Sequence, residues 1–333
     1  MDPLTDLRLL LGDRARAGES LSRHTTARIG GPADLLVEAT SADDLRDLAL
    51  EARKRRVPVF VLGGGANILV SDAGVRGLTI VNRARRLEFL EGDRVWAESG
   101  VVLPTLAREC IARGLSGLEW AVGVPGTVGG AIVGNAGAHG RDTASDVKRA
   151  WILDPDSRVR EWTVDALEFG YRNSRIKREG KGGPRGCPRE PGVDTRYATI
   201  VPVAKRRGIR DTRYVVLAAE FQLARGDRAG LERRAAEFNE YRRRTQPPGA
   251  SMGSMFKNPP GDAAGRLIDV AGLKGARVGQ AEISRTHANF FVNLGGATAR
   301  DVMALVERAR QKVRDQAGVE LELEIELVGD WQD

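Results

Sequence analysis

A glycine-rich, apolar run at residues 117–140 (GLEWAVGVPGTVGGAIVGNAGAHG) constrains the fold of this chain most strongly. The run has neither the 3.6-residue period of an amphipathic helix nor a cluster of polar turn residues. Because glycine lacks a Cβ, such a segment can bring its backbone close to a large buried neighbour. The run therefore predicts closely packed backbone, set against either neighbouring strands or a bound ligand.

A second glycine-rich segment, GGGAN at residues 63–67, directly follows an apolar run that predicts a short buried strand. Backbone N–H groups in such a loop can approach a pyrophosphate closely. The dinucleotide fingerprint G-x-G-x-x-G would require glycine at position 68, where Ile68 stands, which disfavours a Rossmann site. Two glycine-rich segments in one chain suit a long dinucleotide such as FAD, and a tight turn between packed strands is the alternative.

Apolar periodicity and capping signals predict helices at residues 41–56, 104–114, 231–246 and 298–318. The last has the clearest signals, because Thr298 is a suitable N-cap, Asp301 follows three residues later and Gly318 can end the helix. One face of the third helix carries Leu231, Ala235, Phe238 and Tyr241. Pro247 and Pro248 follow that helix, and we interpret them as a boundary between two functional regions.

Strands are expected at residues 57–62, within 68–77, at 214–223 and at 319–327. The last segment alternates strictly, with apolar residues on one face and glutamates on the other, namely Glu320, Glu322, Glu324 and Glu326. A charged strand face is ordinarily solvated, and the alternation alone does not distinguish one glutamate from the next.

Two further segments carry candidate chemistry. Tyr171 and Arg172 lie in FGYRNSR at residues 169–175, where a guanidinium can bind a carboxylate through two hydrogen bonds; a solvated arginine is the alternative. The segment SMGSMFKNP at residues 251–259 can bind a diphosphate and present Ser254 to a reacting carbon. The three histidines lack metal-ligand spacing and none is near Ser254, which disfavours a zinc enzyme or a serine hydrolase.

The net charge of +7 is concentrated in one segment, residues 175–211, which has eleven Lys or Arg residues against four Asp or Glu residues. This distribution argues against a protein with basic faces throughout. A nucleotide- or RNA-binding protein built on this segment is a rival interpretation, although stacking aromatics are sparse there. Residues 178–197 are rich in Gly, Pro and Arg, and we expect them to form a surface loop outside the catalytic core.

Composition also indicates the compartment. The chain has two cysteines, too few for a disulfide framework or a structural zinc site. It lacks a signal-peptide layout and any run of 18 apolar residues, so we expect a cytoplasmic protein without membrane insertion.

These segments together resemble the UDP-N-acetylenolpyruvoylglucosamine reductase family (MurB, UDP-N-acetylmuramate dehydrogenase), flavoenzymes of peptidoglycan precursor synthesis. The resemblance extends from about residue 24 to residue 329. It rests on RIGGPA (28–33), LGGGAN (62–67), GVPGTVGG (123–130), NAGA (135–138), FGYR (169–172), GS (253–254), FKNP (256–259), AGLKG (271–275), HANF (287–290) and ELEI (322–325).

The resemblance implies an α+β fold. It comprises a two-lobed FAD-binding region of the vanillyl-alcohol-oxidase (PCMH) type and a smaller α+β substrate-binding domain. We place a helical extension at 1–20, the FAD-binding region at 21–223 and the substrate-binding domain at 224–333. The two lobes cover about 21–82 and 83–223, with a basic loop insertion at about 178–212.

The resemblance also implies the site. It assigns catalytic roles to Arg172, Ser254 and Glu324, and substrate binding to Tyr171, Lys257 and Asn258. It implies FAD contacts from Gly63, Gly64, Gly65, Ala66, Asn67, Pro125, Gly126, Thr127, Gly129, Gly130, Asn135 and Gly137. The implied FAD is noncovalent, NADPH is the co-substrate, no metal takes part, and we expect a monomer that binds no nucleic acid.

The implied reaction has two halves. NADPH reduces FAD, and N5 of the reduced flavin then passes hydride to C3 of UDP-N-acetylglucosamine enolpyruvate, while Ser254 donates a proton to C2 to give UDP-N-acetylmuramate. Family register alone selects Glu324, so we expect Glu322 and Glu326 to be replaceable.

The chain departs from the family pattern at Ala66, where serine is usual, at His139, where tyrosine is frequent, and at Gly134, where methionine is common. An FAD-dependent alcohol oxidase of the same superfamily is the closer rival. Such oxidases commonly tether flavin through a histidine near the first glycine loop, and none lies between His24 and His139.

Overall fold

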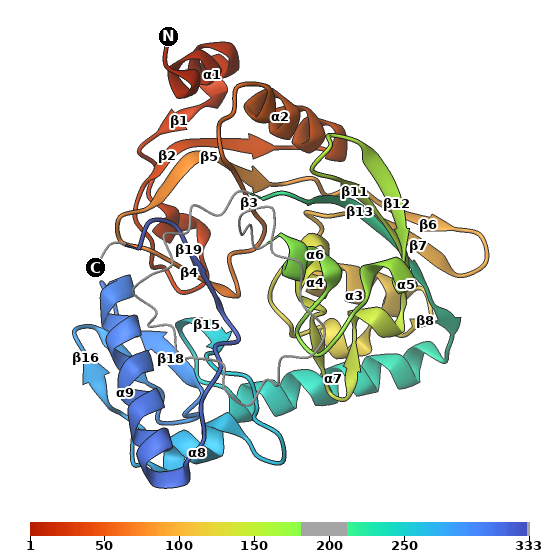
Figure 1. Cartoon of the computed structure of the whole chain (residues 1–333). Helices are drawn as coiled ribbons and strands as arrows, with labels where there is room; N and C mark the ends of the chain where they lie inside the picture. The colour runs from red at the N-terminus through yellow and green to blue at the C-terminus, as the bar shows by residue number, and fades with distance from the viewer. Residues whose placement is uncertain (181–211, 332–333) are drawn as a thin grey trace, which may run out of the picture.

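The computed structural model describes residues 1–180 and 212–331, arranged as two lobes and a C-terminal domain (Figure 1). The first lobe is a sheet in the order β1 (Arg16–Ala17), β2 (Ala33–Ala39), β5 (Val75–Asn82) and β3 (Val59–Leu62). Strands β2, β5 and β3 run parallel, and the helices α1 (Pro3–Leu11) and α2 (Ala42–Lys54) cover this lobe.

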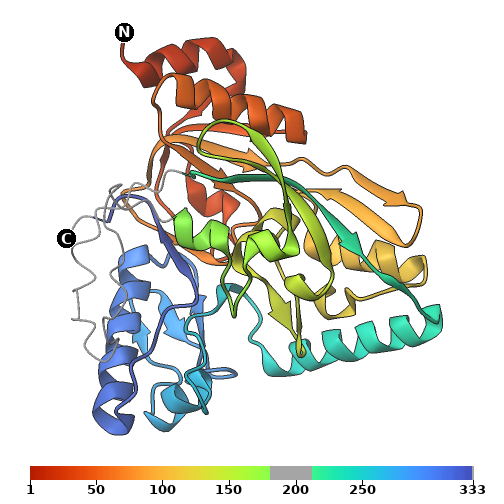
Figure 2. The same cartoon turned by 45° about the vertical axis from the view of Figure 1, so that its right-hand side comes forward.

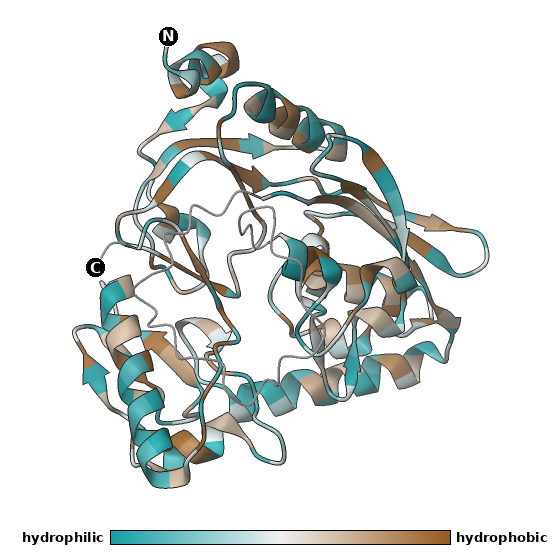
Figure 3. Cartoon of the chain, in the orientation of Figure 1, coloured by the Kyte–Doolittle hydropathy of each residue, from teal (hydrophilic) through white to brown (hydrophobic). Residues whose placement is uncertain are grey.

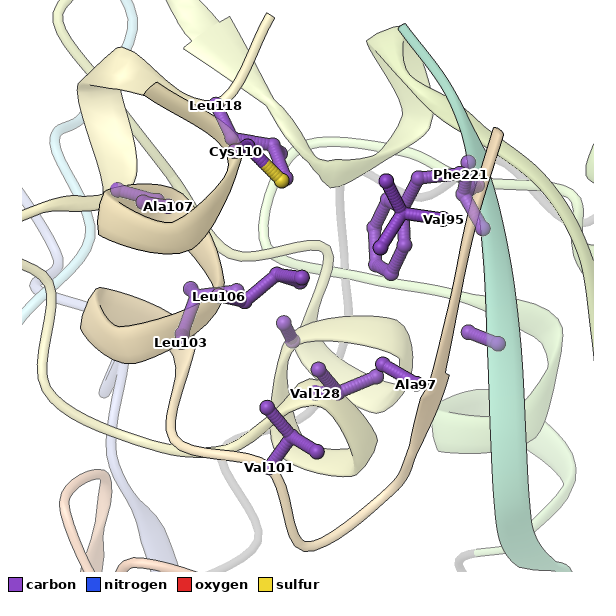
Figure 4. Packing of buried hydrophobic residues seen from close by; sticks show 14 of the residues in the cluster. Val95, Ala97, Val101, Leu103, Leu106, Ala107, Cys110, Leu118, Val128 and Phe221 are labelled. Atoms are coloured by element: carbon purple, nitrogen blue, oxygen red, sulfur yellow. The ribbon is translucent and has the colours of Figure 1, made fainter. Parts of the chain in front are cut away.

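The second lobe is an antiparallel sheet in the order β12 (Val159–Thr163), β11 (Val147–Leu153), β13 (Val215–Gln222), β7 (Arg94–Glu98) and β6 (Leu87–Leu90). The helix α4 (Val128–Gly134) packs on this sheet. The helices α3 (Leu103–Ala112) and α7 (Arg228–Thr245) pack against each other. Leu106 and Cys110 of α3 meet Phe221 of β13 in a closely packed core (Figure 4). Burial in that core raises the pKa of the Cys110 thiol to about 12.

The C-terminal domain is a sheet in the order β15 (Ala250–Ser254), β18 (Phe290–Asn293), β17 (Ala281–Ile283) and β16 (Arg277–Val278). The helices α8 (Ala264–Val270) and α9 (Ala299–Ala317) pack with it. After α9 the chain returns to the first lobe, where β19 (Glu326–Val328) pairs in parallel with β4 (Ile68–Val70). Figure 2 shows this returning segment between the C-terminal domain and the first lobe.

The C-terminal domain shares a core with the first lobe. Ala27, Ile29 and Leu69 of the first lobe belong to the same buried cluster as the apolar face of α9. The Asp72 carboxylate accepts hydrogen bonds from the backbone N–H groups of Ala299 (2.8 Å) and Arg300 (3.0 Å) at the start of α9. A first-lobe side chain therefore caps a helix of the C-terminal domain.

The four predicted helices are confirmed as α2, α3, α7 and α9. In α9, Thr298 and Asp301 form the predicted capping box and Gly318 ends the helix in a left-handed conformation. Figure 3 shows hydrophobic and hydrophilic residues alternating along these helices. Tyr241 is an exception, because its side chain is exposed although Leu231 and Ala235 of the same helix are buried.

One segment contains a helix that its pattern did not indicate, and one strand expectation is wrong. The run at 117–140 contains the short helix α4, because Thr127 caps it and Val128, Ala131 and Ile132 are buried. The segment 319–327 is not one strand, since regular pairing starts only at Glu326. Its earlier part pairs with the C-terminal domain through a bridge between Phe256 and Leu323, and the chain bends before it reaches β4.

The predicted surface loop at 178–197 lies outside the described residues except for its first three, which are the last two residues of the helix α6 (Arg175–Glu179) and its C-cap Gly180. The domain limits at 20, 82 and 223 remain predictions. Leu231 and Ala235 of α7 are buried in the core of the second lobe, although they lie after the predicted limit at 223. No helix in residues 1–180 or 212–331 is long and apolar enough to cross a membrane.

Candidate active site

The two glycine-rich segments, far apart in sequence, pack against each other. A Cβ added to Gly63 would lie 2.5 Å from the Thr127 Oγ1 atom, and one added to Gly64 would lie 3.1 Å from the Gly126 Cα atom. Side chains at these positions would separate the loops, so glycine is what allows the contact.

Bare backbone of these loops also faces open space. A Cβ added to Gly126 would meet no atom within 4 Å, and one added to Gly130 would meet only the Thr127 Oγ1 atom at 3.8 Å. Gly64 and Gly130 are exposed, and Gly126 has a φ of 128°. The loops therefore leave a side-chain-free surface on which a flat ring or a phosphate can approach the backbone, as FAD requires.

Arg172 lies at the tip of a tight turn in which Gly170 and Asn173 exchange two backbone hydrogen bonds of 3.0 and 3.1 Å. Its φ of 53° is in the left-handed region, which is costly for a residue with a side chain. Asn135 supports this turn. Its buried amide nitrogen donates to the Gly170 carbonyl (3.0 Å) and to the Asp142 carboxylate (3.0 Å).

The Arg172 guanidinium is held by two acceptors. Nε donates to the Glu324 Oε1 atom (2.7 Å), and Nη2 donates to the Gly137 carbonyl (2.8 Å). The Arg172 and Glu324 side chains are 26% and 14% exposed, so water screens the ion pair only partly. Nη1 has no hydrogen-bond partner within residues 1–180 and 212–331, which leaves that edge available to an anionic ligand.

Backbone pairing brings Ser254 and Glu324 together. The N–H of Glu324 donates to the carbonyl of Met255 (2.9 Å), the residue after Ser254. The Ser254 hydroxyl, at the end of β15, is partly exposed and has no hydrogen-bond partner among the described residues. The Arg172–Glu324 pair and the backbone next to Ser254 therefore lie side by side, where the second lobe meets the C-terminal domain.

Asn67 joins the glycine loop at 63–67 to this site. Its amide nitrogen donates to the Glu324 carbonyl (3.2 Å), and its own carbonyl accepts from the N–H of Glu326 (2.9 Å). Hydrogen bonds therefore connect the loop predicted to contact FAD with the segment that carries the candidate catalytic glutamate.

The three predicted substrate residues have unlike settings. Tyr171 is exposed, with the Arg172 guanidinium 5.4 Å from its ring centroid. Lys257 forms an ion pair with Glu322, and the exposed Asn258 accepts a hydrogen bond from the N–H of Ala264 at the start of α8 (3.1 Å). Their roles in binding substrate remain predictions.

Sequence reasoning missed Arg242, which lies against Gly123 of the glycine-rich run at 117–140. A Cβ added to Gly123 would lie 2.6 Å from the Arg242 Cδ atom. Burial lowers the pKa of the Arg242 guanidinium, and no carboxylate within the described residues pairs with it. Burial, followed by the charge of Arg242, also lowers the pKa of His139, which stacks on Phe238 at 4.0 Å. The only sequence signal was an arginine run at 242–244.

Sequence reasoning also missed the role of Asn289. Its side-chain amide accepts from the N–H of Phe256 (2.9 Å) and donates to the Phe256 carbonyl (2.8 Å), as a neighbouring strand would. Its backbone carbonyl accepts from the N–H of Met255 (2.7 Å). Asn289 therefore fixes the segment that follows Ser254.

Comparison with known proteins agrees with this geometry. Residues 245–328 match the model of the UDP-N-acetylenolpyruvoylglucosamine reductase C-terminal domain, and residues 33–163 match that of an FAD binding domain. A reductase of that name from Rubrobacter xylanophilus is 44% identical over 95% of this chain and 96% of its own length. One from Chloroflexus aggregans is 43% identical over 94% of this chain and 97% of its own.

The chain belongs to the UDP-N-acetylenolpyruvoylglucosamine reductase family. A crystal structure of a family member from Thermus caldophilus superposes with a TM-score of 0.73 at 33% identity, covering 94% of this chain and 98% of the other. The predicted fold class, an FAD-binding region of the PCMH type followed by a smaller C-terminal domain, is confirmed. The family assignment also disfavours the rival readings as a nucleic-acid-binding protein or an alcohol oxidase.

Proposed function

We propose that this protein reduces the enolpyruvyl group of UDP-N-acetylglucosamine enolpyruvate to give UDP-N-acetylmuramate for peptidoglycan precursor synthesis. The observation that carries the proposal is the meeting of Arg172, Glu324 and the Ser254 segment beside the paired glycine loops. A fixed guanidinium, a hydroxyl donor and a flavin-compatible surface are the groups that this reduction needs.

The glycine loops support noncovalent FAD as the cofactor. Gly126 and Gly130 offer the side-chain-free surface described above, and Gly63 and Gly64 let the facing loop pack against Thr127 and Gly126. The chemistry that FAD would supply when bound is hydride transfer, from NADPH and then to C3 of the enolpyruvyl group.

Arg172 stabilises the charge that develops on the substrate. Hydride addition at C3 places negative charge at C2 and on the adjacent carboxylate, and the uncommitted Nη1 edge can donate to that carboxylate. Glu324 and the Gly137 carbonyl hold the guanidinium in place beforehand, so little reorganisation is needed during the reaction.

Ser254 delivers the proton to C2. A serine hydroxyl is a weak acid, so it gives up its proton only as the carbanion character at C2 develops. The backbone of Ser254 is fixed by pairing with Phe290, and its hydroxyl has no competing acceptor among the described residues.

We further propose that the protein acts as a cytoplasmic monomer.

An anaerobic experiment on the two half-reactions tests the proposal. The purified yellow protein is reduced with NADPH, excess NADPH is removed, and the enolpyruvyl nucleotide is added while flavin absorbance is recorded. We expect reduction by NADPH, and reoxidation on adding the nucleotide with formation of UDP-N-acetylmuramate. Flavin that stays reduced in the presence of the nucleotide would refute the proposed function.

A further inference from the structure

A second ion pair lies beside the Arg172–Glu324 pair. Lys177, in α6, donates from Nζ to the Glu326 Oε1 atom (2.8 Å) and to the backbone carbonyl of Arg172 itself (3.0 Å). The Lys177 and Glu326 side chains are 10% and 17% exposed, so this pair is more enclosed than most ion pairs among the described residues.

The two pairs connect the same two segments. Arg172 and Lys177 both belong to the turn and short helix of the second lobe, and Glu324 and Glu326 lie two residues apart on the segment that returns to β4. Ile325, between the glutamates, is buried in the core of the C-terminal domain. The returning segment is therefore anchored, and the ion pairs fix the Arg172 turn against it.

The alternation by itself favours solvent exposure for all four glutamates, but the last two are enclosed. Glu320 pairs with Arg314 and Glu322 pairs with Lys257 while their side chains remain 58% and 73% exposed. Glu326 is instead enclosed, like Glu324.

The contact with the Arg172 carbonyl has a specific consequence. A residue with a side chain does not hold a left-handed conformation without support from its surroundings, and Arg172 has a φ of 53°. An ammonium group that donates to the carbonyl of that same residue stabilises the turn, and it does so more strongly because the pair is enclosed. Glu326 in turn fixes the ammonium.

We propose that Lys177, anchored by Glu326, is a positioning residue that holds the Arg172 turn in the conformation needed to stabilise charge on the substrate. This inference rests on the proposed function. It assigns Lys177 no contact with the substrate or the cofactor. It also revises the expectation that Glu326 is replaceable, and keeps that expectation for Glu322.

The test compares Lys177→Met with Lys177→Arg, which keeps a cationic donor, and with Arg175→Met as a matched control. Arg175 lies on the same helix and forms an exposed ion pair with Glu179 (2.8 Å), away from the Arg172 carbonyl. FAD content, the midpoint of thermal unfolding, the rate of flavin reduction by NADPH and the rate of reoxidation by the enolpyruvyl nucleotide are measured for each protein, together with kcat and KM.

For Lys177→Met we expect reoxidation to slow by about tenfold or more, because a displaced catalytic group loses rate steeply. We expect this loss in kcat rather than in KM. FAD content and reduction by NADPH should stay within about twofold of wild type, because that half-reaction develops no charge at C2. Lys177→Arg should recover most of the lost rate, and Arg175→Met should match wild type.

Equal slowing of both half-reactions, or a wild-type reoxidation rate in Lys177→Met, would overturn the inference. Should Lys177→Met fail to fold, Glu326→Gln decides, because it keeps the lysine and removes its anchor: we expect slower reoxidation with unchanged reduction, and a wild-type rate overturns the inference. Failure of the wild-type protein to reoxidise would instead refute the proposed function, and this inference with it.

Discussion

Asp146 is a buried carboxyl group whose replacement should change the pH dependence of stability. It precedes β11 in the core of the second lobe, with its side chain 6% exposed. Burial raises its pKa from the ordinary value of 3.8 to about 6, and the hydrogen bond from Arg141 (2.6 Å) opposes that rise only partly. The other carboxylate oxygen has no hydrogen-bond partner among the described residues. The perturbation is Asp146→Asn, which keeps an acceptor for Arg141 and removes the titration.

The magnitude follows from linkage between proton binding and folding. The folded protein keeps the Asp146 proton up to pH about 6, whereas the unfolded chain releases it above pH 3.8. The stability contributed by this group is therefore fully present below 3.8 and lost as pH rises through 6. At about 1.4 kcal/mol for each pH unit, the loss in the free energy of unfolding is about 3 kcal/mol.

Urea denaturation at several pH values between 3.5 and 7, followed by tryptophan fluorescence with FAD in excess, measures this effect. The free energy of unfolding of Asp146→Asn relative to wild type should rise by about 3 kcal/mol across that range. Asp154→Asn is a control whose effect on stability changes mainly as pH falls below 3.8, so its difference from wild type should change little across most of this range. Although burial raises the pKa of Asp154, hydrogen bonds from the Arg158 backbone and from Arg160 outweigh it and lower the pKa. A difference between wild type and Asp146→Asn that is the same at both ends of the range would refute the reasoning.

Three further predictions concern the site. Ser254→Ala should leave flavin reduction by NADPH intact and slow reoxidation by the enolpyruvyl nucleotide about 10²–10⁴-fold, measured by anaerobic stopped flow; equal losses in both steps would contradict its role as proton donor. Glu324→Gln should cut kcat strongly, since it weakens the charge-assisted bond to Arg172, while the exposed Glu322→Gln stays within a few-fold; equal activity of the two in steady-state assays would remove the reason to single out Glu324. Asn289→Ala should lower the free energy of unfolding by about 2–4 kcal/mol, because it leaves the buried N–H and carbonyl of Phe256 without partners, and a urea midpoint equal to that of wild type would show that this clamp is dispensable.

The sequence by itself determined the elements whose signals are local. In α9 the capping box, the apolar stripe and the final glycine all lie within a few residues of the positions they specify. The same holds for the Ser41 cap of α2 and for the proline in the first turn of α3. These signals depend on contacts between residues three or four apart, so they can be predicted without the tertiary structure.

Glycine composition was informative in part. It correctly indicated close backbone packing, since Gly64 meets the backbone of Gly126 and Gly129 meets Ser99. It did not indicate that α4 is a helix, because glycine is a poor helix former and packing of Ala131 and Ile132 against the second-lobe core decides the conformation.

The family resemblance named Arg172, Ser254 and Glu324, but the contacts that connect them were decided by the tertiary structure. The alternating glutamates at 320–326 are equivalent in sequence, and they become different only where the returning segment leaves the bridge with Phe256 and joins β4. That change of partner turns Glu324 toward Arg172, a residue 152 positions earlier in the chain. Contacts over such separations depend on how whole lobes dock, and docking is determined by the combined burial of many side chains rather than by any local pattern.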